Sequence, residues 1–452
     1  MNFKNSNQNS NGETSKAIYE RAVDVLTGGV SRNTIFRKPH PYYAASAKGS
    51  YITDIDGVAR LDFANNMASL VHGHSHPAIV DAVTKQLRKG SAYTMGTEAE
   101  VLFAEHLIKR SPRFEKIRFM NSGTEAVMTM IKASRAFTGK PKIAKAEGAY
   151  HGTYDYAEIS QTANPSNWGD INKPNAVPVV EGTPQKVLED VVIFPFNDIE
   201  RTIHLLDQNA NEIACVLIDP VPHRIGLFPA TNEFIEAIYN WTRKNNALLV
   251  FDEVVSYRVN YAGAQCSYSV KPDLTAMGKI IGGGFPVGAL AGKAEIMEVL
   301  DPRGTFLKHP HSGTFSANPV SMTAGRVAME LFDAQAVSNL NAFAMTARKQ
   351  IEEVIKIVDV PMCITGAGSM FKLHFQEKVP NKYRDAYQNK ETKAIIDELL
   401  DYLFLKENII MINTLACMFA TTLTQKNIDH LSDALLRGLK MMKPKIEQLH
   451  KN

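Results

Sequence analysis

The sequence has few of the features that mark membrane, secreted or nucleic-acid-binding proteins. Only four of its 452 residues are cysteine, and no Cys-x-x-Cys pair occurs among them. This excludes a disulfide scaffold and favours reduced thiols in a cytoplasmic protein. No uninterrupted apolar run approaches the roughly 18 residues of a membrane-spanning helix. The net charge is only +3, with Lys and Arg spread along the chain, so we expect neither a membrane nor a nucleic-acid partner.

Two common cofactor motifs are also missing. No Gly-x-Gly-x-x-Gly follows a predicted strand, which argues against a dinucleotide site. His72, His74 and His76 occupy alternate positions, but no carboxylate or second histidine pair accompanies them at helical spacing. The glycine and proline beside them indicate a turn instead. We therefore predict no metal site.

Length and composition predict a soluble globular enzyme of two domains. A chain of 452 residues exceeds one compact core, and 44% hydrophobic with 21% charged residues is ordinary for such an enzyme. Residues 1–15 are rich in Asn, Ser and Gly, which predicts a disordered tail. We assign residues 76–330 to a large domain. Residues 16–75 and 331–452 are assigned to a smaller one.

Strands and helices alternate through the predicted large domain. Short apolar runs predict buried strands, at 116–120, 141–146, 213–218 and 247–251. The alternation implies an α/β fold with a mostly parallel sheet covered by helices on both faces. Beyond Ala336 the pattern changes to helices with short strands, including a strand pair at 409–423. This predicts a separate α+β unit.

A phosphate site is predicted where strand 116–120 meets the next helix. Ser122 and Glu125 form a Ser-x-x-Glu capping box. A helix N-terminus offers free N–H groups and the positive end of the helix dipole to an anion. A capped helix alone would explain Ser122 and Glu125 but not the intervening Gly123 and Thr124. We therefore favour the phosphate site.

Three further strand ends carry residues that suit a flat heterocyclic ligand. Lys279 follows an apolar strand and precedes three glycines. Burial would make its amine easier to deprotonate and nucleophilic, although most such lysines lie at the surface. Asp252 ends another strand, where a buried carboxylate needs a cation such as a protonated ring nitrogen. Tyr150 and Val254 could pack on the two ring faces, and Tyr150 alone could equally belong to the core.

Pyridoxal 5′-phosphate (PLP) has the complementary groups: a phosphate, a ring nitrogen and an aldehyde. The chain resembles the class III aminotransferases of PLP fold type I from about Gly28 to near its C-terminus. The matching motifs are Asn-Ser-Gly-Thr-Glu-Ala (121–126), Glu-Gly-Ala-Tyr-His-Gly (147–152), Asp-Glu-Val (252–254), Gly-Lys-Ile-Ile-Gly-Gly-Gly-Phe-Pro (278–286) and Gly-Thr-Phe-Ser-Ala-Asn-Pro (313–319). The resemblance is greatest to the branch that holds glutamate-1-semialdehyde aminomutase and transaminases of β- or D-amino acids.

This resemblance implies a large domain with a seven-stranded, mostly parallel sheet and a smaller α+β domain built from both chain ends. It implies that Lys279 forms a Schiff base with PLP and shuttles a proton, and that Asp252 keeps the ring nitrogen protonated. The phosphate would be bound by Ser122, Gly123 and Thr124. Thr314 would reach the phosphate across a subunit interface, which implies a homodimer with shared active sites.

The substrate-binding residues are less defined. Arg32 and Arg37 lie in the loop that the family places at the mouth of the site, and either guanidinium could clamp a carboxylate. Each alone is somewhat more often a solvated surface residue. The alternatives are residues near Met67 and the long segment 160–190, whose length is typical of a lid, an active-site cover or a disordered stretch.

One position departs from the family pattern and two depart from the aminomutase pattern. The family usually has Glu-Pro where this chain has Asp219-Pro220. A glutamate of the aminomutases aligns with Ala416, and their carboxylate-binding arginine aligns with Ile35. The last two differences count against semialdehyde aminomutase activity.

The sequence therefore predicts a PLP-dependent transaminase. It would move an amino group between a 2-oxo acid and an amine or amino acid, including β- or D-amino acids. An aminomutase or an amino-acid racemase or epimerase is the alternative, which these residues do not separate from a transaminase. A non-catalytic protein of the same fold is disfavoured, because Lys279 and Asp252 are both present.

Overall fold

The computed structural model describes residues 14–449. Of the predicted disordered tail, residues 1–13 lie outside the described residues. Ser15 is buried and begins helix α1 (Ser15–Val25), and the Thr14 side chain caps that helix by accepting from the Ala17 N–H. Within residues 14–449, no helix combines the length and the apolar character that crossing a membrane requires.

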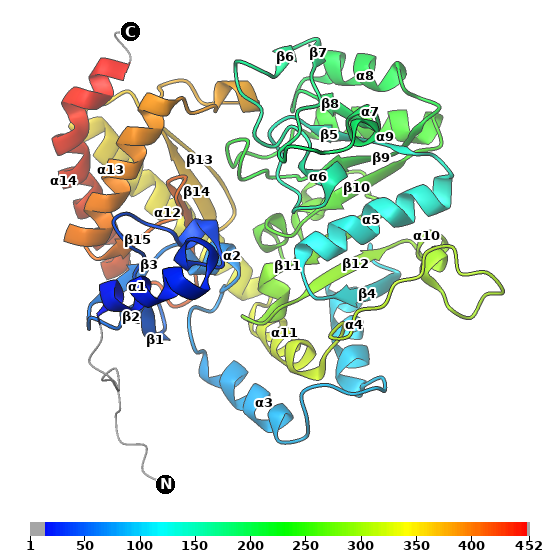
Figure 1. The fold of residues 1–452 in the computed structure, drawn as a ribbon, viewed down its shortest axis with the longest axis horizontal. Coiled ribbons are helices and arrows are strands. Elements are labelled where there is room, and N and C mark those ends of the chain that lie inside the picture. The colour runs from blue at the N-terminus through cyan, green and yellow to red at the C-terminus, as the bar shows by residue number, and fades with distance from the viewer. Residues whose placement is uncertain (1–13, 450–452) are drawn as a thin grey trace.

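A seven-stranded sheet is the centre of the larger part of the molecule (Figure 1), in the order β4-β12-β11-β10-β9-β5-β8. Its strands are β4 (Lys116–Met120), β5 (Lys142–Ala146), β8 (Val191–Phe194), β9 (Ile213–Ile218), β10 (Leu248–Asp252), β11 (Leu274–Gly278) and β12 (Gly288–Gly292). Five adjacent strands of the sheet, β8, β5, β9, β10 and β11, run parallel to one another. Strand β12 is antiparallel to both β11 and β4. The predicted mostly parallel α/β sheet is confirmed.

Strand β12 is a strand that the sequence pattern does not predict. Its sequence, Gly-Ala-Leu-Ala-Gly, has no β-branched residue. A side chain at Gly288 would place its Cβ 2.0 Å from the Ser122 carbonyl oxygen. Gly288 is therefore required because the backbone of Ser122 approaches closely, and not because glycine favours a strand.

Helices cover both faces of this sheet because alternate strand residues point to opposite sides. On β5, Ile143 packs in one apolar cluster with Val127 of α5, while Ala144 packs in a second cluster with Phe234 of α9. The helices of this part are α3 (Pro77–Leu87), α4 (Glu98–Arg110), α5 (Gly123–Thr138), α6 (Asp155–Glu158), α7 (Gln185–Glu189), α8 (Ile199–Asp207), α9 (Asn232–Lys244), α10 (Ala294–Met297) and α11 (Pro319–Leu331).

The smaller part combines both ends of the chain (Figure 1). One sheet has the order β1-β2-β3-β15 and another the order β13-β14-β16. Their strands are β1 (Ala44–Lys48), β2 (Tyr51–Asp54), β3 (Ala59–Asp62), β13 (Cys363–Ala367), β14 (Met370–His374), β15 (Ile409–Ile410) and β16 (Ala416–Met418). The helices are α2 (Asn65–Ala68), α12 (Ala334–Val358), α13 (Lys390–Lys406) and α14 (Gln425–Leu449).

The expected strand pair at 409–423 is wrong as a pair. Strand β15 pairs in parallel with β3, and β16 pairs antiparallel with β14. The two strands are consecutive in sequence but complete two different sheets. A pattern of two apolar runs identifies strands, whereas their partners depend on tertiary contacts.

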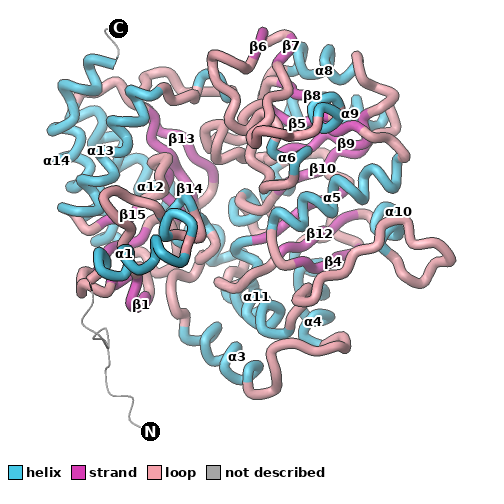
Figure 2. The backbone as a smooth tube through the Cα atoms, viewed as in Figure 1, coloured by secondary structure: helices cyan, strands magenta, loops and turns pink. Residues whose placement is uncertain are grey.

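The segment 160–190 is ordered along its length. It contains the small hairpin of β6 (Gly169–Asp170) and β7 (Lys173–Pro174) and otherwise consists mostly of loop (Figure 2). The guanidinium of Arg384 holds it by donating to the carbonyl oxygens of Trp168 and Gly169, at 3.0 and 2.9 Å. Of the three predicted forms, the disordered one is excluded.

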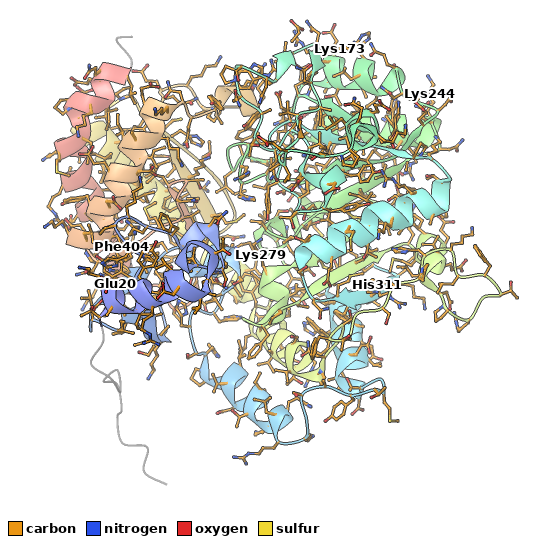
Figure 3. The ribbon with its side chains drawn as sticks, in the orientation of Figure 1. Glu20, Lys173, Lys244, Lys279, His311 and Phe404 are labelled. Atoms are coloured by element: carbon orange, nitrogen blue, oxygen red, sulfur yellow. The ribbon has the colours of Figure 1, made fainter. Side chains whose placement is uncertain are left out.

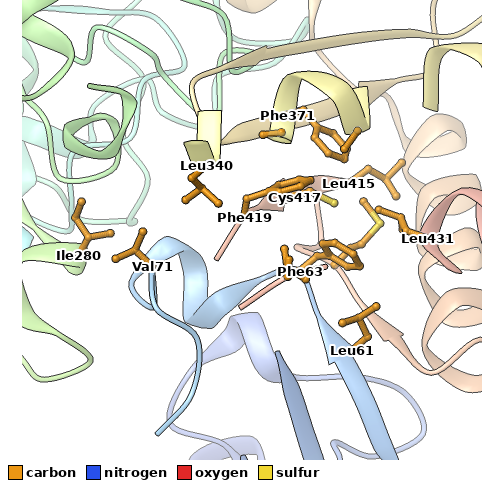
Figure 4. Close-up of a cluster of buried hydrophobic side chains, with 14 of the residues drawn as sticks. Leu61, Phe63, Val71, Ile280, Leu340, Phe371, Leu415, Cys417, Phe419 and Leu431 are labelled. Atoms are coloured by element: carbon orange, nitrogen blue, oxygen red, sulfur yellow. The ribbon is translucent and has the colours of Figure 1, made fainter. Parts of the chain in front are cut away.

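A shared core joins the two parts where Lys279 lies, at their boundary (Figure 3). Ile280, the next residue, belongs to the same apolar cluster as Val71 and as Phe371 and Phe419 of the smaller part (Figure 4). Buried Arg258 adds a polar link by donating to the Ser369 hydroxyl at 3.0 Å. The backbone on either side of the boundary is therefore held in one packed unit.

Candidate active site

A cavity of about 340 Å³ opens where the parallel strands end at their carboxyl termini. Ligand sites of α/β sheets usually lie at this edge. Seven residues predicted from the sequence line it: Ser122, Gly123, Thr124, Tyr150, Asp252, Val254 and Lys279. Residues that were not predicted also line it, including Asn66, Ser69, His151, Asp219 and His223.

The N-terminus of α5 forms one wall of the cavity. Ser122 is the N-cap, and its hydroxyl accepts from the Glu125 N–H at 3.1 Å. The Glu125 carboxylate accepts in return from the Asn121 N–H at 2.7 Å, so the predicted capping box forms with Asn121 as the second donor. The first N–H groups of a helix have no intrahelical acceptor. Those at Gly123 and Thr124 are therefore available to an anion in the cavity.

Gly123 is required by close packing. A Cβ at this position would lie 2.7 Å from a methyl group of Val254. Val254 therefore sits directly against the first turn of α5, next to the proposed phosphate position. The contact places an apolar surface and an anion-binding helix end in the same wall.

Asp252 is the last residue of β10 and is only 4% exposed. One carboxylate oxygen lies 2.8 Å from Nδ1 of His151, and the other accepts from the Val254 N–H at 3.0 Å. Burial lowers the pKa of His151, and the hydrogen bond to Asp252 opposes that shift. Nε2 of His151 is buried and has no hydrogen-bond partner among residues 14–449. His151 stands in a motif that the resemblance identified, yet the sequence alone assigned it no role.

Lys279 directly follows β11 in a left-handed backbone conformation, with φ of +51°. Non-glycine residues adopt this conformation at a cost, and such residues gather at functional sites. Burial lowers the pKa of the Lys279 amine, while the carboxylates of Asp252 and Asp219 oppose that shift. The amine is thus desolvated beside two carboxylates. The sequence predicts one of them, Asp252, in the same site as Lys279.

Asp219 and His223 extend the site beyond the predicted residues. Asp219 follows β9, is 5% exposed and accepts from the Val221 N–H at 3.0 Å. Burial, and then the neighbouring Asp252 carboxylate, raise the pKa of Asp219. The His223 ring meets Tyr150 edge-on, with 5.8 Å between ring centroids. The position of Asp219 at a strand end was a signal for the site, but nothing in the sequence pattern indicated His223.

The two arginines proposed for substrate binding lie in different environments. Arg32 donates to the side-chain oxygen of Asn66 at 2.8 Å, and Asn66 lines the cavity. Arg37 forms an ion pair with Asp401 and lies 4.0 Å from the centre of the Phe404 ring. Figure 3 shows Phe404 within the smaller part, well to one side of Lys279. Arg37 is thus committed to packing in the smaller part, and Arg32 is the one placed beside the cavity.

Two other predicted residues lie outside the cavity lining. Met67 has a positive φ of +55° and stands between Asn66 and Ser69, which do line the cavity. Thr314 is exposed on the loop that leads into α11. The predicted role of Thr314 is to contact the phosphate of a second subunit. Its exposure in a single chain is compatible with that role, which stays a prediction.

Residues 35–439 match the family model described as Aminotransferase class-III. The chain belongs to the class III aminotransferases. Among curated relatives, it is 38% identical to glutamate-1-semialdehyde 2,1-aminomutase of Methanothermobacter thermautotrophicus over 82% of this chain and 86% of the relative. This class III aminotransferase also resembles a solved ω-transaminase from Sphaerobacter thermophilus, with 43% identity, a TM-score of 0.92 and coverage of 95% and 98% of the two chains.

A second solved structure, a transaminase with PLP bound, is 37% identical with a TM-score of 0.88 and covers 96% of this chain and 98% of that one. The predicted PLP fold type I is confirmed for this class III aminotransferase. The family implies PLP as cofactor, and the cavity residues fit that group. They offer free N–H groups for a phosphate, a buried carboxylate for a ring nitrogen and a desolvated amine for an aldehyde.

Proposed function

We propose that this class III aminotransferase is a PLP-dependent transaminase that moves an amino group between a 2-oxo acid and an amino acid or amine. The observation that carries the proposal is the meeting of Lys279, Asp252 and the N-terminus of α5 in one cavity. These three features come from different strands of the sheet. Their convergence supports PLP chemistry more strongly than any one of them alone.

When bound, PLP supplies an aldehyde carbon that carries the amino group and a ring that withdraws electrons from the reacting carbon. Lys279 contributes an amine whose lowered pKa increases its neutral fraction, so that it can accept and return a proton at that carbon. Asp252 would hold a proton on the ring nitrogen. Ser122, Gly123 and Thr124 would bind the phosphate, and Tyr150 and Val254 would flank the ring.

An aminomutase or a racemase is the second candidate, and the 38% identity to an aminomutase favours it. The position aligned with the aminomutase glutamate argues against that activity. Ala416 is buried in β16 and stands opposite Lys372 of β14, so no carboxylate is present at this point of the sheet. We therefore do not propose glutamate-1-semialdehyde as the substrate of this chain.

A panel of amino donors with pyruvate and 2-oxoglutarate as acceptors separates the two candidates. A transaminase forms a new oxo acid from the donor and a new amino acid from the acceptor. A racemase destroys optical activity without an acceptor, and an aminomutase isomerises its substrate without one. Acceptor-independent turnover, with no oxo acid formed from any donor, would reject the transaminase.

A homodimer with shared active sites is part of the proposal. Met95 and Phe306 are 82% and 81% exposed, and Phe315 beside Thr314 is 59% exposed. A subunit interface that covered these side chains would remove their apolar surface from water. Light scattering should give twice the chain mass. Mixing Lys279→Ala chains with chains that carry an inactivating substitution of Thr314 should restore activity if each site uses both subunits.

A cytoplasmic location is proposed from the sparse, scattered cysteines, all four of which are free.

A further inference from the structure

The loop after β9 is fastened to the sheet of the smaller part. The carbonyl oxygen of Gly226 accepts from the Thr365 hydroxyl at 2.5 Å, and Nε2 of His374 lies 3.2 Å from the same oxygen. Thr365 and His374 are also hydrogen-bonded to each other, at 2.8 Å. These contacts bring the segment that carries His223 and Arg224 against strands β13 and β14.

Lys372 is on the same face of this sheet. It precedes His374 by two residues on β14 and is paired with Thr365 across the antiparallel ladder. Side chains two residues apart on a strand, or directly opposite across a pair, point to the same face. The Lys372 ammonium therefore faces the loop that Thr365 and His374 contact.

Lys372 is a buried residue without a counter-ion. Lys372 is 3% exposed, and its Nζ makes no hydrogen bond or ion pair with any residue between 14 and 449. Its neighbour across the other ladder is the small, apolar Ala416. Burial, and then the charge of Arg224, lower the pKa of Lys372 to about 8. A buried cation with no partner is costly, which points to an anion that is supplied from outside the chain.

Arg224 lies behind the cavity wall, against a ring that lines the cavity. The Arg224 guanidinium carbon lies 5.4 Å from the centre of the Tyr150 ring, and both Tyr150 and His223 line the cavity. In the part of the chain that the structure describes, Arg224 has no carboxylate partner. We name Arg224 and Lys372 the cationic cluster. Burial and the neighbouring cations lower the pKa of His223 well below its ordinary value, so its ring is a neutral neighbour of the cluster.

Two of the carboxylates around the cavity already have partners. Both oxygens of Glu147 bind the Arg384 guanidinium, at 2.8 and 2.9 Å. Asp252 is bound to His151. Neither carboxylate is therefore free to neutralise Arg224 or Lys372.

We propose that the cationic cluster binds a substrate carboxylate remote from the reacting carbon, so that the enzyme prefers dicarboxylic oxo acids and acidic amino acids. The inference rests on the proposed transaminase function for its substrates. The remote carboxylate would accept charged hydrogen bonds from Arg224 and Lys372. His223 and Tyr150 would form the wall between this group and the reacting end.

Calorimetry of the purified holoenzyme with two unreactive acids tests the cluster directly. Glutarate and pentanoate have the same chain length but carry two carboxylates and one, respectively. Arg224→Gln and Lys372→Met should each weaken glutarate binding by about tenfold or more, as expected for loss of one charged hydrogen bond, and should leave pentanoate unchanged. Arg88→Gln, at an exposed arginine at the end of α3, is the matched control. Equal affinities of glutarate for wild type and both variants would overturn the proposal.

Steady-state kinetics with 2-oxoglutarate and 2-oxopentanoate show which carboxylate is bound. The variants should raise KM for 2-oxoglutarate alone. An equal rise for both acceptors would place the cluster at the reacting end and overturn the remote assignment. Lys372→Arg keeps the charge and should retain most of the glutarate affinity, which separates loss of charge from misfolding of Lys372→Met. Glutarate binding without any transamination would reject the proposed function and leave the cluster standing.

Discussion

The two parts of the molecule supply the site in different ways. In the larger part, Asp219, Asp252 and Lys279 each stand at the carboxyl end of a neighbouring parallel strand, so the sheet itself brings them together. In the smaller part, Lys372 lies within strand β14 and faces the loop after β9, which packs against that strand. The larger part is thus organised for the chemistry, which depends on strand ends. In our proposal the smaller part contributes to substrate recognition, which depends on how the two parts pack.

This comparison predicts its largest effect at Lys279. Lys279→Ala should lower kcat by at least about 10³-fold, because the amine both anchors the cofactor and moves a proton. The chain should remain folded and dimeric. Lys271→Ala, at an exposed lysine before the same strand, is the control and should retain activity. More than trace turnover in Lys279→Ala would remove the strand-end amine from the mechanism.

A second substitution compares the two ends of the sheet. Asp252 ends β10 at the cavity, whereas Asp273 precedes β11 at the other end and pairs with Arg243 and Lys293. Asp252→Asn should lower kcat by orders of magnitude, roughly 10²-fold or more, because an amide no longer favours a protonated ring nitrogen. Cofactor occupancy, read from its visible absorbance, should fall much less.

The matched variant Asp273→Asn should give the reverse pattern. It removes a fully buried carboxylate from two cations and should lower the melting temperature while kcat changes by less than about threefold. If Asp252→Asn reduces only stability as well, Asp252 is a structural residue and the two ends of the sheet do not differ in function.

The same comparison explains what the sequence could predict. Lys279, Asp252 and the Ser122 turn follow apolar strands, and local sequence is sufficient to mark a strand and the residue at its end. Lys372 and Arg224 carry no such mark, since their proposed role depends on Thr365 and His374 contacting Gly226. The predicted strand pair at 409–423 was wrong for the same reason. Strand β15 pairs with β3 of the N-terminal segment, and β16 pairs with β14, more than 40 residues earlier in the chain.

Arg32 and Arg37 sharpen the contrast within one loop. Truncating Arg32, beside Asn66 at the cavity, should raise KM for an amino acid about tenfold and leave the matching amine without a carboxylate nearly unchanged. Arg37→Ala removes an ion pair and a ring contact in the smaller part, so its effect should appear in stability and be equal for both substrates. A larger amino-acid-specific effect at Arg37 would reverse the assignment made from the structure.

The expected effect of Asp219 is on the pH dependence of stability and not on turnover. Burial and the Asp252 charge raise its pKa in the folded chain, so the folded state binds this proton more tightly than the unfolded state does. The contribution to stability is complete below the ordinary carboxyl pKa of about 4 and is lost as pH rises toward the folded pKa. Asp219→Asn keeps an oxygen for the Val221 N–H but cannot lose a proton. The melting temperature of Asp219→Asn relative to wild type should therefore increase steadily from pH 5 to pH 8. The corresponding difference in the free energy of unfolding should grow by no more than about 1.4 kcal/mol per pH unit. Glu253, whose pKa burial raises to about 8, titrates in both proteins and largely cancels in the difference. A difference that stays constant over this range would show that Asp219 is already ionised at pH 5, stabilised by Lys279 despite its burial.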